Sequence, residues 1–397
     1  MPAPTVSDRL APFGTTIFAE VTALALRHNA VNLSQGFPDF DGPAFVKDAA
    51  KAAMDAGHNQ YARTLGVPPL NEAIAEWYRR GGGRPVDPTA EITVTSGCTE
   101  ALAACFLGLL NPGDEVILFE PYYDSYRAGV VLAGGVARFV TLRPGPDGRF
   151  VFDEDELARA FGPRTRALVL NTPHNPTGKV FTRGELALIA SLCERHGVTV
   201  IADEVYERLT FDADRPHVSI ASLPGMAERT IVCSSLGKTF SLTGWKIGWT
   251  VAPPNLTACV RAAHQFLTFA TATPLQHGAA AALSDPASEP YVHGLVAEYR
   301  AGRDFLADAL ASLGFGVYRP DGTYFILADH TPVSRRLGLH DDAAFCRHLT
   351  AKVGVAAIPP SVFYENKEHG RTLVRFAFCK RRETLEEAVR RLRAALA

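Results

Sequence analysis

The sequence predicts an α/β fold: a mostly parallel sheet between layers of helices, followed by a smaller α/β unit. Two observations lead to this prediction. Through the middle of the chain, short and nearly continuous apolar runs alternate with helix-like stretches, and in the last third this alternation gives way to another pattern. Strands covered on both faces are apolar along their whole length, and their alternation with helices is typical of parallel sheets.

Seven segments are the candidate strands of the large sheet. They are Glu91–Thr95, Glu115–Phe119, Phe139–Leu142, Ala167–Asn171, Thr199–Val205, Thr230–Ser234 and Ile247–Val251. Helix-like stretches separate several of them, for example Thr99–Leu110 and Gly184–His196.

The last third predicts the smaller unit, beginning with a long helical stretch after Ala279. Its short strand candidates are Tyr324–Ala328, Val355–Ile358 and Leu373–Phe378. One stripe of a closing helix contains Leu385, Val389, Leu392 and Leu396. The chain before about residue 45 has no sheet of its own and should pack with this unit. We therefore expect an N-terminal segment 1–45, a large domain 46–284 and a small domain 285–397.

Composition narrows the function classes. The 397 residues include 40 basic and 42 acidic ones, a formal net charge of −2, so neither a nucleic-acid surface nor a polybasic membrane patch is expected. The N-terminal MPAPTVSDRLAPFG does not have the pattern of a signal peptide, and no apolar run is long enough to span a membrane. Seven cysteines without paired spacing indicate reduced thiols, so we expect a cytoplasmic protein without a metal site.

Lys238 is the first candidate for chemistry. It stands in SSLGKTF, directly after a β-branched strand candidate, where small neighbours would let it reach a bound aldehyde. A lysine that forms an imine needs a neutral amine, which a partly buried, electropositive site favours. Lys246, eight residues later, would suit a phosphate. The alternative is that both are surface lysines.

Acidic and amide side chains follow two other strand candidates. Asp203 ends an apolar strand, and ligand-binding groups in open α/β sheets gather at such carboxyl ends. A carboxylate there can pair with a protonated pyridine nitrogen, although a helix-capping Asp is the plain alternative. The rigid turn NTPHNPTG presents Asn175, and we expect His174 beside it to be a bystander.

The turn TSGCTEA joins a strand to a helix and is a candidate phosphate cradle. Small residues at a helix N-terminus let backbone N–H groups approach an anion. Cys98 in this turn is not expected to be a nucleophile, because no Cys–His pattern accompanies it.

Eight segments in order then resemble fold-type I aminotransferases of class I/II, most of all the kynurenine/glutamine aminotransferase branch. They are NLSQGFPDF, NQYARTLG, TSGCTEA, EPYYDSY, NTPHNPTGK, DEVYE, SSLGKTFSLTGWKIGW and LVRFAF. N-succinyldiaminopimelate and methionine aminotransferases are similar as well. The resemblance spans nearly the whole chain and implies a mostly parallel seven-stranded sheet, pyridoxal 5′-phosphate as cofactor, and a homodimer with shared active sites.

The resemblance also implies roles for single residues. Lys238 would bind the cofactor covalently and then move the substrate proton, Asp203 would pair with the pyridine nitrogen, and Tyr206 would hydrogen-bond the phenolic oxygen. The other implied cofactor contacts are Gly97, Cys98, Thr99, Tyr123, Asn175, Ser235, Lys246 and, from a second subunit, Tyr61. The implied substrate contacts are Gly36, Asn175, Arg375, Phe18 and Phe269. A planar guanidinium such as that of Arg375 matches a carboxylate through two hydrogen bonds, which lysine cannot reproduce.

Three positions depart from the pattern of relatives. Lys246 stands where many relatives have Arg, although the kynurenine branch also has Lys there. Two positions depart from the branch itself: Cys98 stands where it often has an aromatic residue, and Ala270 where a histidine often follows the pocket phenylalanine. These departures affect the preferred side chain and leave the transamination chemistry intact.

The sequence leaves three functions open. The first is transfer of an amino group from an L-amino acid with a large uncharged side chain, such as Phe, Met, Gln or kynurenine, to a 2-oxo acid by a ping-pong mechanism. Its aromatic pocket candidates are Phe18, Tyr61, Tyr123, Phe269 and Phe363. The second is an N-succinyldiaminopimelate aminotransferase of lysine biosynthesis, with Arg63 as the nearest basic residue for the succinyl group; Arg261 should lie too far along a helix. The third is a cysteine-conjugate β-lyase, and a non-enzymatic regulator is not expected.

Overall fold

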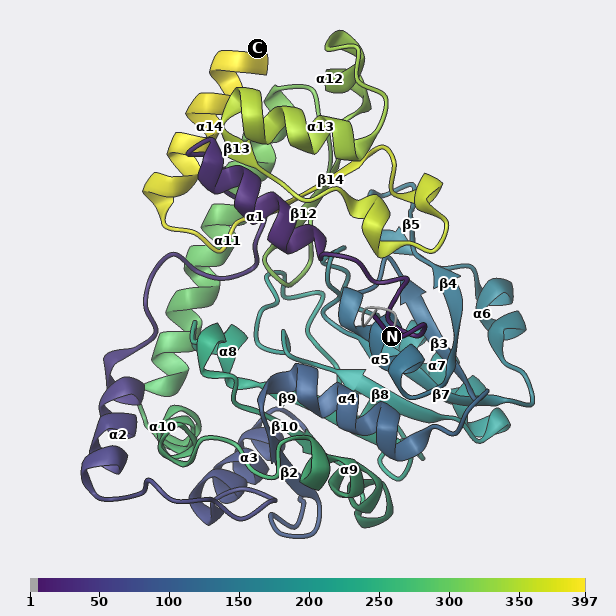
Figure 1. The fold of residues 1–397 in the computed structure, drawn as a ribbon, viewed down its shortest axis with the longest axis vertical. Helices are drawn as coiled ribbons and strands as arrows, with labels where there is room; N and C mark the ends of the chain where they lie inside the picture. The colour runs from purple at the N-terminus through teal and green to yellow at the C-terminus, as the bar shows by residue number, and fades with distance from the viewer. Residues whose placement is uncertain (1–5, 397) are drawn as a thin grey trace, which may run out of the picture.

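The computed structural model describes residues 6–396, and within them a seven-stranded sheet forms the centre of the molecule (Figure 1). Its strand order is β2-β10-β9-β8-β7-β3-β4, and only the two pairings of β10 are antiparallel. The strands are β2 (Ile92–Thr95), β3 (Glu115–Glu120), β4 (Val136–Thr141), β7 (Thr165–Asn171), β8 (Thr199–Asp203), β9 (Thr230–Ser235) and β10 (Gly248–Val251). These are the seven strands expected from the sequence, with ends shifted by a few residues.

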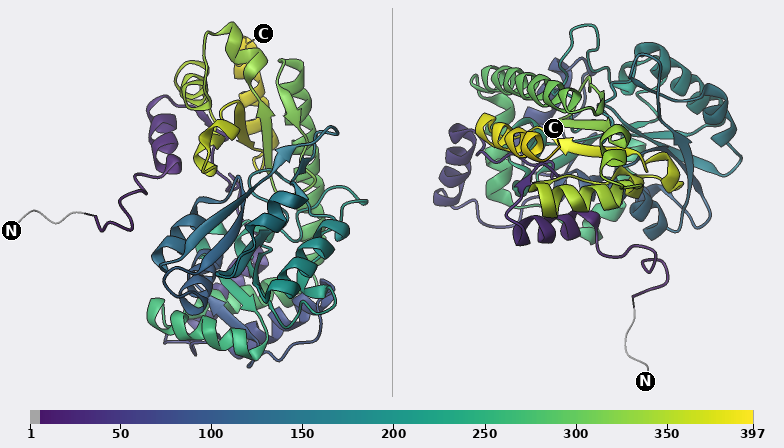
Figure 2. Two further views of the ribbon diagram at one scale, coloured as in Figure 1. Left: turned by 90° about the vertical axis from the view of Figure 1, so that its right-hand side faces the viewer. Right: turned by 90° about the horizontal axis from the view of Figure 1, so that it is seen from above.

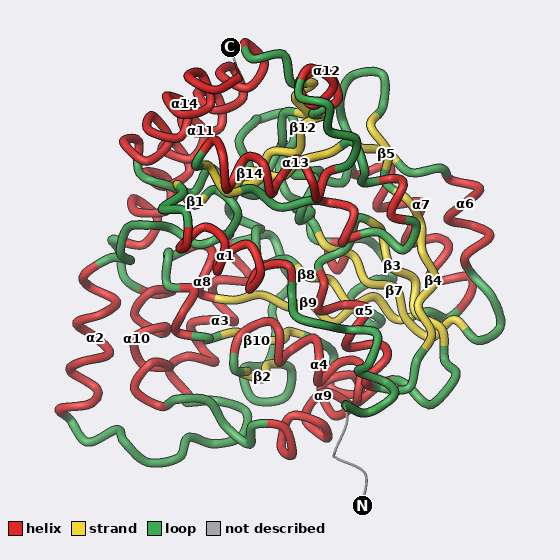
Figure 3. The backbone as a smooth tube through the Cα atoms, turned by 45° about the horizontal axis from the view of Figure 1, so that its top comes forward, coloured by secondary structure: helices red, strands yellow, loops and turns green. Residues whose placement is uncertain are grey.

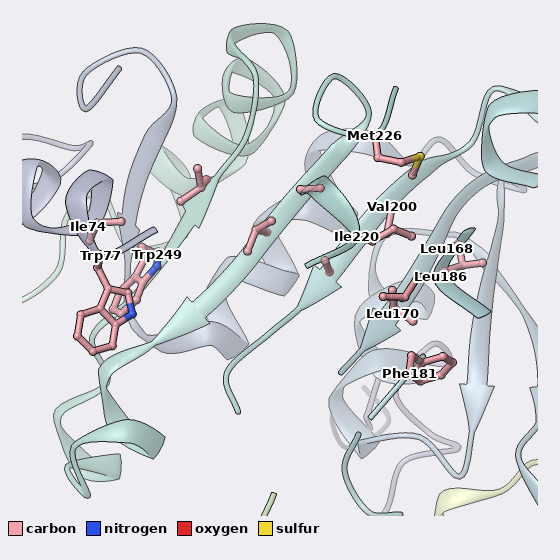
Figure 4. Close-up of a cluster of buried hydrophobic side chains, with 14 of the residues drawn as sticks. Ile74, Trp77, Leu168, Leu170, Phe181, Leu186, Val200, Ile220, Met226 and Trp249 are labelled. Atoms are coloured by element: carbon pink, nitrogen blue, oxygen red, sulfur yellow. The ribbon is translucent and has the colours of Figure 1, made fainter. Parts of the chain in front are cut away.

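Helices cover both faces of this sheet. One face lies against α4 (Gly97–Leu109), α5 (Asp124–Leu132) and α9 (Pro254–Leu267). The other lies against α3 (Pro68–Arg80), α7 (Arg183–His196) and α10 (Thr273–Ser284), with α2 (Ala44–Asp55) packed outside α10. Figure 4 shows buried side chains of this second layer.

Side chains alternate between the two layers along each strand. In β7, Leu168 and Leu170 pack with α7, whereas Ala167 and Val169 pack with α4 and α5. Because both faces are covered, the inner strands are buried at nearly every position, which explains their nearly continuous apolar runs in the sequence.

The smaller unit is built on an antiparallel sheet of order β11-β12-β14 (Figures 2 and 3). Its strands are β11 (Gly316–Tyr318), β12 (Phe325–Asp329) and β14 (Leu373–Ala377). Its helices are α11 (Ser288–Ser312), α12 (Thr331–Arg336), α13 (Asp342–His348) and α14 (Arg382–Leu396). The four residues of the expected α14 stripe are all buried.

The N-terminal part of the described chain joins this smaller unit. Strand β1 (Val31–Asn32) pairs in parallel with β13 (Val355–Ala356), and α1 (Ile17–Arg27) packs on Ile358 and Phe363. The boundaries at residues 45 and 284 remain a prediction.

Two details differ from the sequence-based expectation. The helical stretch after Ala279 is two helices, α10 and α11, because the chain breaks at Asp285-Pro286, where proline cannot continue the first helix. Strand β11 was not expected; it is three residues long and half exposed, so it has no clear apolar pattern. Other short elements include β5 (Arg143–Pro144), β6 (Phe150–Val151), α6 (Glu154–Ala160) and α8 (Leu236–Thr239). Within residues 6–396, no helix is both long and apolar enough to cross a membrane.

Candidate active site

A cavity of about 360 Å³ lies where the carboxyl ends of β7, β8 and β9 meet the smaller unit. These strands contribute Asn171, Asp203 and Ser235 to its wall, in agreement with the rule that ligands bind at the carboxyl ends of parallel strands. The expected site residues that line it are Phe18, Gly36, Gly97, Cys98, Thr99, Tyr123, Asn175, Asp203, Tyr206, Ser235, Lys238, Lys246 and Arg375. Residues from eight separate segments of the chain are thus brought together.

Lys238 lies in the short helix α8, directly after β9. Burial lowers the pKa of its amine, and the charge of nearby Lys246 acts in the same direction, although Asp203 opposes it. The Nζ atom is 5.8 Å from the ring centroid of Tyr206 and 5.7 Å from that of Tyr324. A larger fraction of the amine is therefore neutral than for an exposed lysine, which is what attack on a carbonyl carbon requires.

Asp203 is a buried carboxylate held by three donors. Its Oδ2 accepts from the Tyr126 hydroxyl at 2.6 Å, and its Oδ1 accepts from the backbone N–H of Val205 at 3.3 Å and from the Cys98 thiol at 3.6 Å. Burial raises the pKa of Asp203, while the Tyr126 hydrogen bond opposes that rise. A cationic group in the cavity would stabilise the ionised carboxylate.

The start of α4 forms an anion cradle. Gly97 has a φ of +76°, and a Cβ added there would lie 3.1 Å from Cε and 3.3 Å from Nζ of Lys246. The Lys246 ammonium is in turn 3.5 Å from the Thr99 hydroxyl. Open backbone N–H groups at a 13-residue helix, together with a lysine, are a phosphate-binding arrangement.

Arg375 lies in β14 and is only 1% exposed. Its Nη1 donates to Asn175 Oδ1 at 3.2 Å and its Nη2 to the Ser34 carbonyl at 2.9 Å, whereas Nε has no partner among the described residues. Burial lowers its pKa to about 10. Among residues 6–396, no carboxylate forms an ion pair with the Arg375 guanidinium, so an anionic ligand would supply the missing negative charge.

Aromatic rings surround the guanidinium of Arg375. The ring centroids of Phe325, Phe363 and Phe18 lie 4.1, 5.2 and 5.4 Å from its Cζ. Phe18 and Phe325 line the cavity, whereas Phe363 is buried behind Phe18. Phe363 is therefore a support for the wall in this structure and does not itself face the cavity.

Two expected contacts lie outside the cavity of their own chain. Tyr61 is 87% exposed and Phe269 is 48% exposed, and their rings meet edge to face at 5.7 Å. Arg63 is exposed near them and donates to the Gly66 carbonyl. Arg261 is fixed to the loop before β2 and to the strand itself through Thr89, Ile92 and Thr93, and it does not line the cavity.

His174 is buried beside the cavity without lining it. Its Nδ1 is 2.8 Å from the Thr177 hydroxyl, and burial lowers its pKa to about 3. A histidine held so strongly in the neutral form does not take up a second ring proton near neutral pH, and its role as a bystander stays a prediction.

Sequence reasoning missed two tyrosines of this site. Tyr126 lies in the first turn of α5, three residues after the N-cap Tyr123, and the two rings meet edge to face at 5.7 Å. Its place in the same EPYYDSY segment as Tyr123 is a signal that could have been used. Tyr324 is fully buried, meets the Tyr206 ring at 5.2 Å and donates to the Gly36 carbonyl at 2.6 Å. It comes from the smaller unit, and no local pattern in the sequence marks it.

Comparisons with known proteins agree with this geometry. The family described as Aminotransferase class I and II matches residues 28–392. A probable N-succinyldiaminopimelate aminotransferase of Mycobacterium tuberculosis is 50% identical over 97% of both chains, and a methionine aminotransferase of Escherichia coli is 42% identical over 97% of both. The solved structure of N-succinyldiaminopimelate aminotransferase from Mycobacterium tuberculosis superimposes with a TM-score of 0.94, covering 99% of this chain and 100% of that one at 49% identity.

Proposed function

The chain belongs to the class I and II aminotransferase family, and from that premise we propose that it moves an amino group between a large, uncharged L-amino acid and a 2-oxo acid with pyridoxal 5′-phosphate as cofactor. The observation that carries the proposal is the buried guanidinium of Arg375. It has no carboxylate partner in residues 6–396, and it lines the same cavity as the amine of Lys238.

The residues present fit pyridoxal phosphate. Gly97, Thr99, Ser235 and Lys246 would hold the phosphate, and the start of α4 supplies the open N–H groups that such an anion needs. Asp203 would pair with the pyridine nitrogen. When bound, the cofactor supplies an electron sink for negative charge at the substrate α-carbon.

The other cofactor contacts follow from position in the same cavity. Tyr123 would stack on the ring, Tyr206 and Asn175 would hydrogen-bond its phenolic oxygen, and Cys98 would lie beside Asp203. Tyr126 keeps the Asp203 carboxylate oriented through its 2.6 Å hydrogen bond.

Two side chains of this chain would act on the substrate. Arg375 binds the α-carboxylate, assisted by Asn175 and the backbone of Gly36. The Lys238 amine then removes the proton from the substrate α-carbon and later returns a proton, for which its lowered pKa is suited. Because Arg375 grips any α-carboxylate, the same cavity serves the donor and then the acceptor, as a ping-pong cycle requires.

The side chains that line the cavity support a large uncharged donor. Four aromatic residues are among them: Phe18, Phe37, Tyr123 and Phe325. The only basic residues of the described chain in this lining are Lys238, Lys246 and Arg375, which are already assigned to proton transfer, the phosphate and the α-carboxylate. A donor with a second carboxylate would find no further basic group from this chain, whereas an apolar side chain would contact the rings.

N-succinyldiaminopimelate is the second candidate donor, and the 50% identical relative from Mycobacterium tuberculosis favours it. Its succinyl group would need a basic residue, and Arg63 is exposed close to Tyr61. This candidate therefore depends on a second copy of the chain that brings Arg63 to the neighbouring cavity.

A homodimer with shared active sites is also part of the proposal. The exposed Tyr61 and Phe269, with Phe266 at 86% exposure, form an apolar surface that a second copy would cover. Tyr61 would then reach the phosphate and Phe269 the donor in the partner's cavity. All seven cysteines are free thiols, which supports location in the cytoplasm.

The test is kcat/KM for Phe, Met, Gln, kynurenine, Asp and N-succinyldiaminopimelate with one common 2-oxo acid, using Lys238→Ala as the inactive control. We expect an uncharged donor to exceed aspartate by about tenfold or more, roughly 1.4 kcal/mol in transition-state binding. If aspartate is preferred, the aromatic-wall proposal fails; if N-succinyldiaminopimelate is preferred, the second candidate replaces the first. Pyruvate and ammonia in place of a new amino acid would identify a β-lyase.

A further inference from the structure

A second cavity, of about 340 Å³, lies on the opposite face of the sheet from the active site. Successive side chains of a strand point to opposite faces of the sheet, and along β9 Ser235 lines the active-site cavity whereas its neighbour Ser234 lines the second cavity. Asp203 and Glu204 divide in the same way after β8. We call this space, enclosed by α3, the end of β8, β9 and β10, the back-face cavity.

The inner wall of the back-face cavity is rich in acceptors. Glu204 is 2% exposed; its Oε2 is 3.2 Å from His217 Nε2, and its Oε1 has no hydrogen-bond partner within residues 6–396. His217 Nδ1 and Ser219 Oγ are likewise buried without a partner there. Polar atoms buried in this way cost free energy until a ligand or solvent binds them.

The charges of this wall do not balance. Glu204 has one ionisable partner, His217; burial lowers the pKa of this histidine, but the charge and hydrogen bond of Glu204, together with the charge of Glu207, outweigh that effect and raise it. Glu207 accepts only the neutral Trp77 indole N–H, at 2.8 Å, and no lysine or arginine of the described chain forms an ion pair with either carboxylate. Burial raises the pKa of Glu207, and the charge of Glu204 adds to that rise. A bound cation would relieve this repulsion.

The two arginines of the back-face cavity are engaged elsewhere. Arg208 forms a two-point ion pair with Glu289, with one contact at 3.1 Å, and Arg80 donates to the Leu283 carbonyl at 2.6 Å. Both guanidinium groups also lie over the Trp77 ring, at 4.6 and 5.3 Å. They are 22% and 34% exposed and so lie toward the mouth, and neither forms an ion pair with Glu207.

The residues that line the back-face cavity favour an organic cation over a metal ion as its ligand. In residues 6–396, no group of three or more His, Cys, Asp or Glu side chains is arranged to hold a metal. The wall instead contains three aromatic residues, Trp77, Tyr78 and Trp249, and Figure 4 shows the two indoles at one end of the buried cluster. Carboxylates combined with aromatic faces attract alkylammonium groups.

We propose that the back-face cavity binds a small organic ammonium ion, with its protonated nitrogen against Glu204 and Glu207 and its carbon atoms against the aromatic wall. The cavity is nearly as large as the active one, so a ligand of several heavy atoms fits. The C-terminal end of α3, where Gly81 lines the cavity, adds partial negative charge that favours the same ligand.

The probe for the test is N-methylpiperidinium, added to the holoenzyme, with N-methyl-2-piperidone as its neutral counterpart. A tertiary ammonium ion cannot condense with an aldehyde, so its signal does not arise from reaction at the cofactor. Calorimetry gives the affinity, and tryptophan fluorescence reports the location, because Trp77 and Trp249 are two of the three tryptophans in the chain. We expect the cation to bind and the lactam to bind at least tenfold more weakly.

Variants complete the test. Glu204→Gln and Glu207→Gln should each weaken binding of N-methylpiperidinium at least tenfold. Glu72→Gln, which removes an exposed charge from α3, should not. If Glu204→Gln does not fold, as judged by circular dichroism, Glu207→Gln decides. Equal binding of cation and lactam, absence of binding, or equal affinities in the Glu207 and Glu72 variants would each overturn the proposal.

Discussion

Arg375 shows how a single buried charge can indicate a ligand. A guanidinium removed from water needs compensation, and in the described chain it receives only two neutral acceptors, Asn175 Oδ1 and the Ser34 carbonyl. The lowering of its pKa to about 10 measures the same deficit. The rings of Phe18 and Phe325 keep water away from it, which strengthens its attraction for a substrate carboxylate.

Replacing Arg375 by lysine should therefore weaken substrate recognition and leave cofactor binding intact. A lysine offers one ammonium where a bound carboxylate would accept two parallel hydrogen bonds from arginine. We expect kcat/KM to fall by an amount equivalent to about 2–3 kcal/mol of transition-state stabilisation. Steady-state kinetics and the absorption spectrum of the bound cofactor are the measurements. Arg371→Lys, an exposed change in the same region, is the matched control. Near-normal kcat/KM in Arg375→Lys would remove this residue from the substrate site.

The burial of His174 predicts that the folded protein loses part of its stability as the pH falls. Its pKa is about 3 in the folded protein against 6.5 unfolded, because burial disfavours the imidazolium. A depressed folded pKa contributes stability that is complete above pH 6.5 and is lost as the pH falls toward 3. Between pH 8 and pH 5, this one group should lower the free energy of unfolding of the wild type by about 2 kcal/mol.

The check is urea denaturation of wild type and His174→Gln at both pH values. The variant should be less stable at pH 8 but should lose about 2 kcal/mol less on acidification. His28→Gln, an exposed substitution of the same kind, should follow the wild type. Parallel losses in wild type and His174→Gln would show that His174 is not buried as a neutral imidazole.

At the scale of elements, the turn that joins β2 to α4 is the proposed phosphate site. Gly97 adopts a left-handed φ of +76°, and its missing side chain leaves the space next to Lys246 open. Gly97→Ala would strain the backbone and place a methyl group in that space. We expect the affinity of the apoenzyme for pyridoxal phosphate to fall about tenfold or more, equivalent to roughly 1.4 kcal/mol.

Gly113 provides the control for that experiment. It also has a positive φ, +87°, but a Cβ there would meet nothing within 4 Å. Gly113→Ala therefore carries the backbone strain without the obstruction. If both variants bind the cofactor as tightly as the wild type does, the start of α4 is not the phosphate site.

Elements and motifs could be predicted from the sequence to different degrees. Most strands of the large sheet were accessible because they are nearly continuous apolar runs. Lys238, Asp203 and Asn175 were accessible because each stands at the end of such a run or within four residues of it. Tyr324 was not accessible, since it reaches the site through packing of the smaller unit, 288 residues along the chain from its partner Gly36. The back-face cavity was equally hidden, because strand alternation, and not a motif, brings its carboxylates together.

At the scale of the whole molecule, the exposed pair Tyr61 and Phe269 is difficult to explain in a single copy. An 87% exposed tyrosine resting on a half-exposed phenylalanine leaves apolar surface in water, and neither ring lines the cavity of its own chain. A symmetric dimer would bury both rings and bring each Tyr61 to the other subunit's phosphate cradle. In the proposed dimer, each active site would be built from two chains.

Subunit mixing tests that arrangement. Lys238→Ala and Tyr61→Ala should each be inactive or nearly so alone, but dimers reassembled from an equal mixture should recover roughly one quarter of wild-type activity, because half are mixed and each mixed dimer has one complete site. A mixture of Lys238→Ala with Arg375→Ala is the control, and it should recover nothing, since both residues line the same chain's cavity. Recovery in the control, no recovery in the test mixture, or an active enzyme that remains monomeric at every concentration would contradict the shared site.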